Sequence, residues 1–159
     1  MKAMLVGLAL AASAASPAIA MGERPASVET ITYERGPCHG TCPVYRVTVS
    51  SNGRGTFEGI QHTAATGTRS FRATTAQWAE FKRRLAADRP VGEVMLDGPE
   101  RCAMYATDLP TIDVRWSGAR RPGHLAYNIG CDRPTHARMA RALTSAPEAL
   151  PIARFIGAN

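Results

Sequence analysis

The sequence lacks the short motifs that identify common enzyme classes. It contains no G-x-S-x-G nucleophile motif, no glycine-rich phosphate-binding loop and no pair of carboxylates at a catalytic spacing. A hydrolase site would have to be assembled wholly from residues that are far apart in the chain. We therefore predict a non-catalytic protein, and the sequence indicates no cofactor.

The chain also lacks an apolar run long enough to cross a bilayer, which takes about 20 residues. Its uncharged apolar stretch, residues 3–15, follows Met1 and Lys2 and precedes the small-residue site Ala18-Ile19-Ala20. This pattern predicts a signal peptide over residues 1–20, cleaved before Met21, with no transmembrane segment afterwards. An uncleaved membrane anchor is the alternative. No cysteine lies near the cut, which argues against a lipid anchor.

Repeats, low-complexity tracts and interdomain linkers are absent as well, so residues 21–159 are expected to form a single exported domain, periplasmic or secreted. Cysteine is scarce, but its four residues all lie beyond the predicted cut. In an oxidising compartment they are expected to pair. Three pairings are possible. The close pair Cys38–Cys42 leaves Cys102–Cys131, and we favour that solution.

Acidic residues are fewer than basic ones, which gives a formal net charge of +6. The excess lies in the second half of the chain. The candidate patch for an anionic partner comprises Arg115, Arg120, Arg121, Arg138 and Arg141. Such a patch suits anionic envelope components such as lipopolysaccharide or phospholipid headgroups. The abundance of arginine and alanine is also typical of a GC-rich genome. Nucleic acid is not an expected partner outside the cytoplasm.

Period-two alternation predicts β-strands in both halves of the chain. The predicted strands are residues 29–35, 44–50, 55–59, 68–73, 111–118 and 124–130. Asn52-Gly53 predicts a type I′ hairpin turn between the second and third of these. Residues 91–110 show no clear period and are expected to form a long ordered loop.

Two segments have helical spacing instead. Thr74 and Gln77 form a capping box ahead of Trp78, Phe81 and Leu85, which recur as the buried face of a helix does. Residues 131–143 predict a second helix, capped near Asp132 with Pro134 in its first turn. The expected fold is α+β: an antiparallel sheet built from hairpins, with two helices packed on one face.

Two stretches resemble a bacterial family known as domain of unknown function 6438. They are residues 31–59, which contain "CHGTCPVY" and the Asn52-Gly53 turn, and "TDLPT" at residues 107–111. The resemblance spans about residues 28–130 and implies a small exported or envelope-associated domain. It implies no activity. The matching positions are Cys38, Gly40, Thr41, Cys42, Pro43, Tyr45, Asp108 and Pro110. His39 departs from the pattern, since many relatives have an aromatic residue there, and Cys102 and Cys131 fall outside it.

The CHGTC stretch supports three hypotheses. Cys38 and Cys42 form a local disulfide, with Gly40 allowing the turn; or the two thiols and His39 bind a soft metal such as Cu(I); or the cysteines are redox-active. Reactive C-x3-C-P motifs precede a helix whose N-terminus lowers the thiol pKa. Here Pro43 leads into a predicted strand, so we favour the structural disulfide.

Other candidate residues carry weaker signals. His62, His124 and His136 show no metal-ligand spacing and are interpreted as surface or structural histidines. Asp108 could be catalytic, but an aspartate two residues before a proline is more often a turn former. An inhibitor of host lysozyme is disfavoured, because a basic protein repels a basic enzyme. The sequence thus predicts an exported, disulfide-bonded binding or envelope domain, with a metal-binding or thiol-redox protein as the alternative.

Overall fold

A computed structural model of the chain describes residues 27–118 and 121–157. The predicted signal peptide and Arg120 lie outside the described residues. In chain order the strands and main helices are β1 (Thr30–Arg35), β2 (Val44–Ser50), β3 (Arg54–Gln61), β4 (Gly67–Arg72), α1 (Thr75–Ala86), β5 (Gly92–Leu96), β6 (Thr111–Ser117), β7 (Gly123–Asn128), α2 (Arg133–Ser145) and α3 (Ala153–Ile156). Short 3-10 turns, η1 (Pro99–Arg101) and η2 (Ala146–Ala149), precede β6 and α3.

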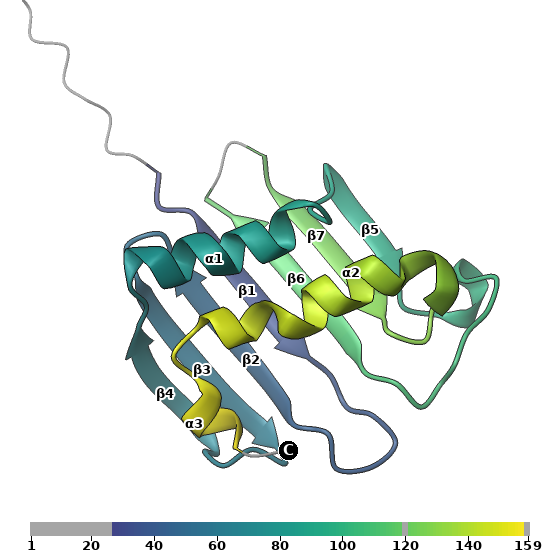
Figure 1. Ribbon diagram of the computed structural model, residues 1–159, viewed down its shortest axis with the longest axis horizontal. Coiled ribbons are helices and arrows are strands. Elements are labelled where there is room, and N and C mark those ends of the chain that lie inside the picture. The colour runs from purple at the N-terminus through teal and green to yellow at the C-terminus, as the bar shows by residue number, and fades with distance from the viewer. Residues whose placement is uncertain (1–26, 119–120, 158–159) are drawn as a thin grey trace, which may run out of the picture.

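The seven strands form one sheet in the order β4-β3-β2-β1-β6-β7-β5 (Figure 1). β1 is central because it pairs antiparallel with β2 on one side and with β6 on the other, joining the two hairpin units. Every pairing is antiparallel except that of β5 with β7, which is parallel. The predicted α+β fold, a mostly antiparallel sheet covered by two helices, is confirmed.

Alternation in the sequence decides which face of the sheet is buried. Tyr45, Val47 and Val49 of β2 are at most 3% exposed, while Arg46 between them faces solvent. α1 supplies the matching cover: Trp78, Phe81 and Leu85 are its buried residues, as the helical spacing predicts. Its capping box is also present, with Thr74 and Gln77 each bonding the other's backbone N–H. The core therefore lies between the sheet and the helices.

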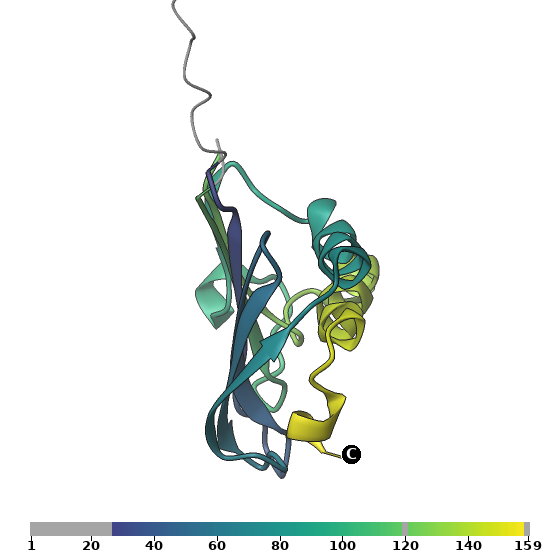
Figure 2. The ribbon, with the colours of Figure 1, turned by 90° about the vertical axis from the view of Figure 1, so that its left-hand side faces the viewer.

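The three α-helices of the described residues lie on one side of the sheet (Figure 2). Figure 2 shows α1, α2 and α3 on the same side, with the sheet seen edge-on. The opposite face is polar, because the outward residues of the central strands are threonine, serine and charged residues. Arg46 on this face contacts Glu34 at 2.8 Å and Glu58 at 2.9 Å. Within the described ranges no helix is long and apolar enough to cross a membrane.

The expected loop over residues 91–110 is wrong in part, because Gly92–Leu96 forms β5. This strand lies at the edge of the sheet, and residues 92–94 are exposed while Met95 and Leu96 are half-buried. Alternation arises when one face of a strand is buried and the other solvated. Neither face of β5 is fully buried, so its sequence does not alternate between apolar and polar residues and gives no strand signal.

The turn expected at Asn52-Gly53 also differs. A type I′ turn needs positive φ at both central residues. Here only Gly53 has positive φ, at 80°, and its N–H donates to the Ser50 carbonyl at 2.8 Å. The Asn52 side chain accepts from the N–H of Arg54 at 3.0 Å. A Cβ on Gly53 would come within 2.5 Å of the Ala73 carbonyl oxygen. Both the positive φ and this close approach therefore require glycine.

Candidate functional site

Three loops meet at the end of the sheet where β1 and β7 finish and β6 begins. They are residues 36–43, residues 97–110 and residues 129–132, and we call their meeting point the disulfide-bonded end. The N–H of Gly36 donates to the Thr111 carbonyl at 2.9 Å, and the N–H of His39 donates to the Asp108 carbonyl at 3.1 Å. The two stretches that resemble the family, far apart in sequence, are thus in direct contact.

Both disulfides lie at this end. Cys38 is joined to Cys42 with a Cα–Cα distance of 5.8 Å, and Cys102 to Cys131 with 5.3 Å. This is the pairing that the sequence favours. The first disulfide closes loop 36–43 on itself, and the second ties loop 97–110 to the residues that precede α2. One disulfide therefore constrains loop 36–43 internally, and the other attaches loop 97–110 to the segment that leads into α2.

One residue that the sequence did not single out, Asn128, belongs to this framework. Asn128, 4% exposed, donates to the Leu109 carbonyl at 2.9 Å and to the Thr111 hydroxyl at 3.2 Å. Its amide oxygen accepts from the N–H of Gly130 at 2.8 Å. A buried polar side chain that satisfies its hydrogen bonds in this way specifies one loop conformation. No sequence signal marked this role, because Asn128 falls inside the predicted strand 124–130 and ends β7 only in the structure.

Asp132 plays a part that differs from the predicted one. It does precede α2, but its side chain does not cap the helix, and its φ of 44° is left-handed. Its carboxylate instead accepts from the N–H of Met104 at 2.7 Å and of Ala103 at 3.2 Å. The carboxylate thus fixes loop 97–110 beside the Cys102–Cys131 disulfide.

The family-like residues fall into two groups. Pro43, Tyr45 and Pro110 are buried, so their role is packing. Gly40, Thr41 and Asp108 are exposed, as is His39, and Gly40 has a φ of 127°. The Asp108 carboxylate accepts from the Thr107 hydroxyl at 3.2 Å. The bond is to a neighbouring side chain, so the turn-forming role of Asp108 stays a prediction.

Beneath this end lies an aromatic layer. The rings of Tyr33 and Tyr45 stack with centroids 6.2 Å apart, and Tyr45 stacks on Phe57 at 5.5 Å. Burial raises the pKa of Tyr45 to about 12, despite the opposing charge of Arg35. Burial likewise raises the pKa of Tyr33 well above its usual range, helped by the neighbouring Tyr45. Both hydroxyls therefore stay protonated near neutral pH.

The metal hypothesis for CHGTC needs free thiolates, and in this structure both sulfur atoms are engaged in the disulfide. A second group, Cys131, Asp132 and His136, has ligand atoms within 4.8 Å of one another. Cys131 also belongs to a disulfide, and Asp132 is held by two backbone N–H groups. Neither group presents a thiolate ligand in the oxidised state.

The remaining histidines are separated from one another. His124 lies on the open sheet face between Glu93, at 2.6 Å, and Asp113, at 2.7 Å. His62 has a φ of 53° in the turn after β3. His136 lies on α2, where its ring meets that of Tyr127 edge-on at 5.7 Å.

The described arginines of the candidate patch do not gather on one face. Arg115 lies on the open face of the sheet and pairs with Asp113 at 3.1 Å. Arg138 and Arg141 lie on α2, on the opposite side (Figure 2). Arg121 lies in the turn before β7, where its carbonyl accepts from Arg89. The positive charge is thus distributed over the molecule.

The fold and the disulfide-bonded end define a class: a disulfide-bonded α+β domain of the kind that forms in oxidising surroundings outside the cytoplasm. Residues 29–141 match the family described as Domain of unknown function (DUF6438), and the chain belongs to that family. The match extends past the expected residues 28–130 into α2. No curated protein and no solved structure gives a significant match to the chain.

Proposed function

We propose that the chain is an exported, non-catalytic binding domain of the cell envelope and that it binds through the disulfide-bonded end. The observation that carries the proposal is the fixing of three loops by two disulfides and by backbone hydrogen bonds between the loops. Binding residues are commonly carried by loops that a rigid scaffold positions. The rigidity lowers the entropy that such a surface loses on binding.

The side chains presented there suit a protein partner. His39, Thr41 and Asp108 are exposed, and Met104 is an exposed apolar side chain at 59%. Met104 lies beside the Cys102–Cys131 disulfide, and its N–H is held by Asp132 at 2.7 Å. A methionine adapts its shape to a partner because its side chain is unbranched and polarizable. The surface therefore combines one apolar contact with surrounding polar groups.

Photo-crosslinking in the producing cell tests this proposal. A photoreactive amino acid at position 39 or 104 is expected to yield a discrete adduct with an envelope component. The matched control places the same amino acid at Thr68, an exposed residue on the edge strand β4, which lies three strands away from β1 and carries none of the three loops. Equal adducts at all three positions, or none at 39 and 104, would contradict the proposal.

Export is part of the proposal and has its own test. The disulfides support an oxidising compartment, and the sequence of residues 1–20 supports a cleaved signal peptide. N-terminal sequencing of the protein from the periplasm or the medium is expected to begin at Met21. A stable membrane-bound form that begins at Met1 would contradict it.

The formal net charge is +6 for the full chain and +5 once Lys2 is removed with the signal peptide, and this excess supports attraction to anionic envelope components. Because Arg115 and Arg121 are separated from the arginines of α2, we propose long-range attraction rather than a defined lipid site. Binding to vesicles with anionic headgroups is then expected to be weak and to fall steeply with salt. Tight binding that is abolished by Arg141→Glu alone would indicate a defined site instead.

A thiol-redox or metal-binding function remains the second candidate. It is favoured by one observation: Cys38 and Cys42 are only half-buried, so a reductant can reach their disulfide. His39 is exposed between them. Reduction would bring two thiols and an imidazole into one short loop.

A further inference from the structure

We propose that β5 and α2 form a binding site for an extended peptide of another protein, one with an aliphatic side chain flanked by acidic residues. The peptide adds a strand to the free edge of β5 and inserts its aliphatic side chain between β5 and α2. This site lies outside the disulfide-bonded end and does not depend on the function proposed above.

The first observation is the state of the β5 edge. β5 is the last strand of the sheet and, within residues 27–118 and 121–157, pairs only with β7. An edge strand presents a row of unpaired backbone N–H and C=O groups, and proteins usually guard such rows with charged side chains. The one charged residue of β5, Glu93, is held at 2.6 Å by His124 on the neighbouring strand. Val91 and Val94 are instead exposed at 82% and 37%.

The other edge of the sheet is guarded. β4 carries Arg69 and Arg72, and the turn before it is bonded to the C-terminal segment, where the N–H of Ala65 donates to the Phe155 carbonyl at 2.9 Å. Two edges of one sheet are thus treated differently. On β5 the corresponding protection is limited to the shortness of the strand and the single charge of Glu93.

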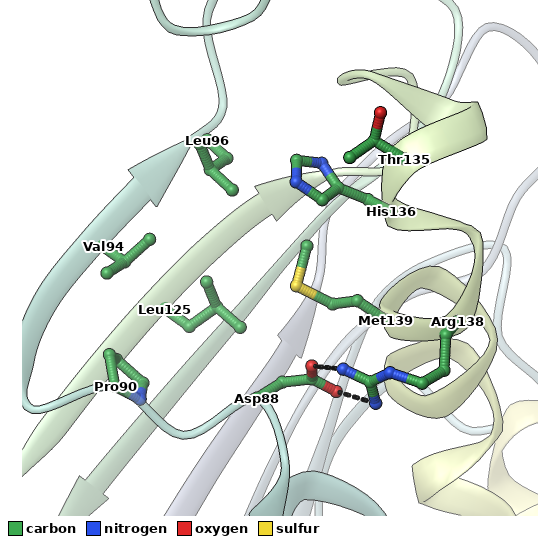
Figure 3. A pocket seen from close by; sticks show the side chains of 9 residues that line it. All are labelled: Asp88, Pro90, Val94, Leu96, Leu125, Thr135, His136, Arg138 and Met139. Atoms are coloured by element: carbon green, nitrogen blue, oxygen red, sulfur yellow. Dashed lines mark hydrogen bonds and ion pairs between the residues drawn. The ribbon is translucent and has the colours of Figure 1, made fainter.

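The second observation is a cavity of about 240 Å³ between β5 and α2. Figure 3 shows Val94 and Leu96 of β5, Leu125 of β7 and Met139 of α2 facing it. Small-molecule sites typically measure roughly 300–1,000 Å³. The cavity is smaller than that, so it fits one side chain better than a whole ligand. Strand addition uses pockets of this kind to select alternate side chains of the added peptide.

The third observation is the charge of the helical wall. α2 contains Arg133, Arg138 and Arg141 and no acidic residue. Asp88, whose side chain is 4% exposed, pairs with Arg138 at 2.5 Å across the cavity, and this pair is the dashed contact in Figure 3. Asp88 compensates the charge of Arg138, so the positive excess of α2 comes from Arg133 and Arg141, which are exposed and form no ion pair among the described residues. An added strand would lie beside this basic helix, which favours acidic residues next to the inserted aliphatic side chain.

The same charge disfavours a second copy of this chain as the occupant. Symmetric pairing of β5 with β5 would bring two arginine-bearing α2 helices toward each other. Like charges across an interface suppress association. We therefore assign the site to an acidic peptide segment of another protein.

Selection from a phage-displayed random dodecapeptide library against the full-length oxidised protein tests the proposal. Selected peptides are expected to share an aliphatic residue flanked by aspartate or glutamate. The strongest peptide is then synthesised, and its affinity is measured by fluorescence anisotropy. Val94→Lys, which charges the edge, and Met139→Trp, which fills the cavity, are each expected to weaken binding by about tenfold or more. Thr68→Lys on the guarded edge is the matched control and should change nothing.

N-methylation of the peptide separates strand addition from ordinary side-chain contact. Methyl groups on alternate backbone nitrogens should abolish binding in one register and leave it unchanged in the other, because only every second N–H of an added strand faces β5. Circular dichroism verifies the fold of each variant, and Val94→Lys alone is decisive if Met139→Trp does not fold. The proposal is overturned by a selection without enrichment, by peptides indifferent to Val94→Lys, or by self-association that Val94→Lys removes.

Discussion

The N–H of His39 donates a hydrogen bond of 3.1 Å to the carbonyl oxygen of Asp108. This bond joins the two stretches by which the chain resembles its family, and it does so through the backbone alone. Neither side chain takes part in it, and both are exposed. The contact therefore depends on the shape of the two loops rather than on the identity of the two residues.

The first prediction follows from that bond. His39→Ala and Asp108→Ala should each change the free energy of unfolding by no more than about 0.5 kcal/mol, as is usual for exposed substitutions. Denaturant unfolding measures this. In contrast, Asn128→Ala should cost about 1–3 kcal/mol, because it leaves buried partners of the amide unsatisfied. Equal losses for all three variants would show that the loop side chains hold this end together.

The second prediction concerns the two disulfides. Replacing Cys102 and Cys131 by serine opens a loop with a sequence separation of 29 residues, and the chain-entropy relation then gives a loss of about 3–4 kcal/mol. Replacing Cys38 and Cys42 opens a separation of only 4 and should cost much less. Denaturant unfolding of the two double variants compares them directly. A larger loss from the Cys38–Cys42 variant would contradict this ranking.

The third prediction separates a structural CHGTC loop from a copper site. The reduced protein should bind Cu(I) weakly in competition with a chelator, and His39→Ala should leave that binding unchanged. If Cys38, Cys42 and His39 are ligands, removing any one should cost most of the affinity, and binding should fall at low pH as the ligands protonate. Tight one-to-one binding that requires His39 would favour the metal function.

The fourth prediction uses a buried hydroxyl. Among the described residues, the Tyr33 hydroxyl is buried without a hydrogen-bond partner. Removing an unsatisfied buried polar group while keeping the ring is neutral or stabilising. Tyr33→Phe should therefore leave the melting temperature unchanged or raise it. A clear loss of stability would show that the hydroxyl has a partner in solution, such as a bound water.

The fifth prediction concerns alkaline pH. Burial raises the pKa of Tyr33 and of Tyr127, and that of Tyr45 to about 12, whereas an unfolded tyrosine has a pKa of about 10. Because the folded pKa values are raised, the associated stability is fully present below about pH 10 and is lost as the pH rises toward the folded values. In an alkaline pH titration, the absorbance of ionised tyrosine should thus rise at the same pH at which the circular dichroism signal of the folded protein is lost. Ionisation of these tyrosines in the intact fold would contradict the prediction.

Local sequence determined the elements whose signals are local. Alternation placed Tyr45, Val47 and Val49 on the buried face of β2, and the Thr74–Gln77 capping box marked the start of α1. Both patterns arise from neighbours in the chain: a strand alternates its faces, and a cap bonds the first turn of its own helix. The close spacing of Cys38 and Cys42 likewise favoured the pairing that the structure forms.

Tertiary structure decided the features that depend on contacts between residues far apart in the sequence. β5 has no period-two signal, because at the edge of the sheet neither of its faces is fully buried, and its place there depends on pairing with β7, which comes much later in the chain. Asp132 was expected as a cap, yet its carboxylate serves the backbone of loop 97–110. Arg115 and the pair Arg138 and Arg141 belong to one candidate patch in the sequence, but Arg115 lies on the open face of the sheet and the other two lie on α2, on the opposite side (Figure 2). The parallel pairing with β7 places Val94 beside Leu125, and Met139 of α2 lines the same cavity, a juxtaposition that no local pattern encodes.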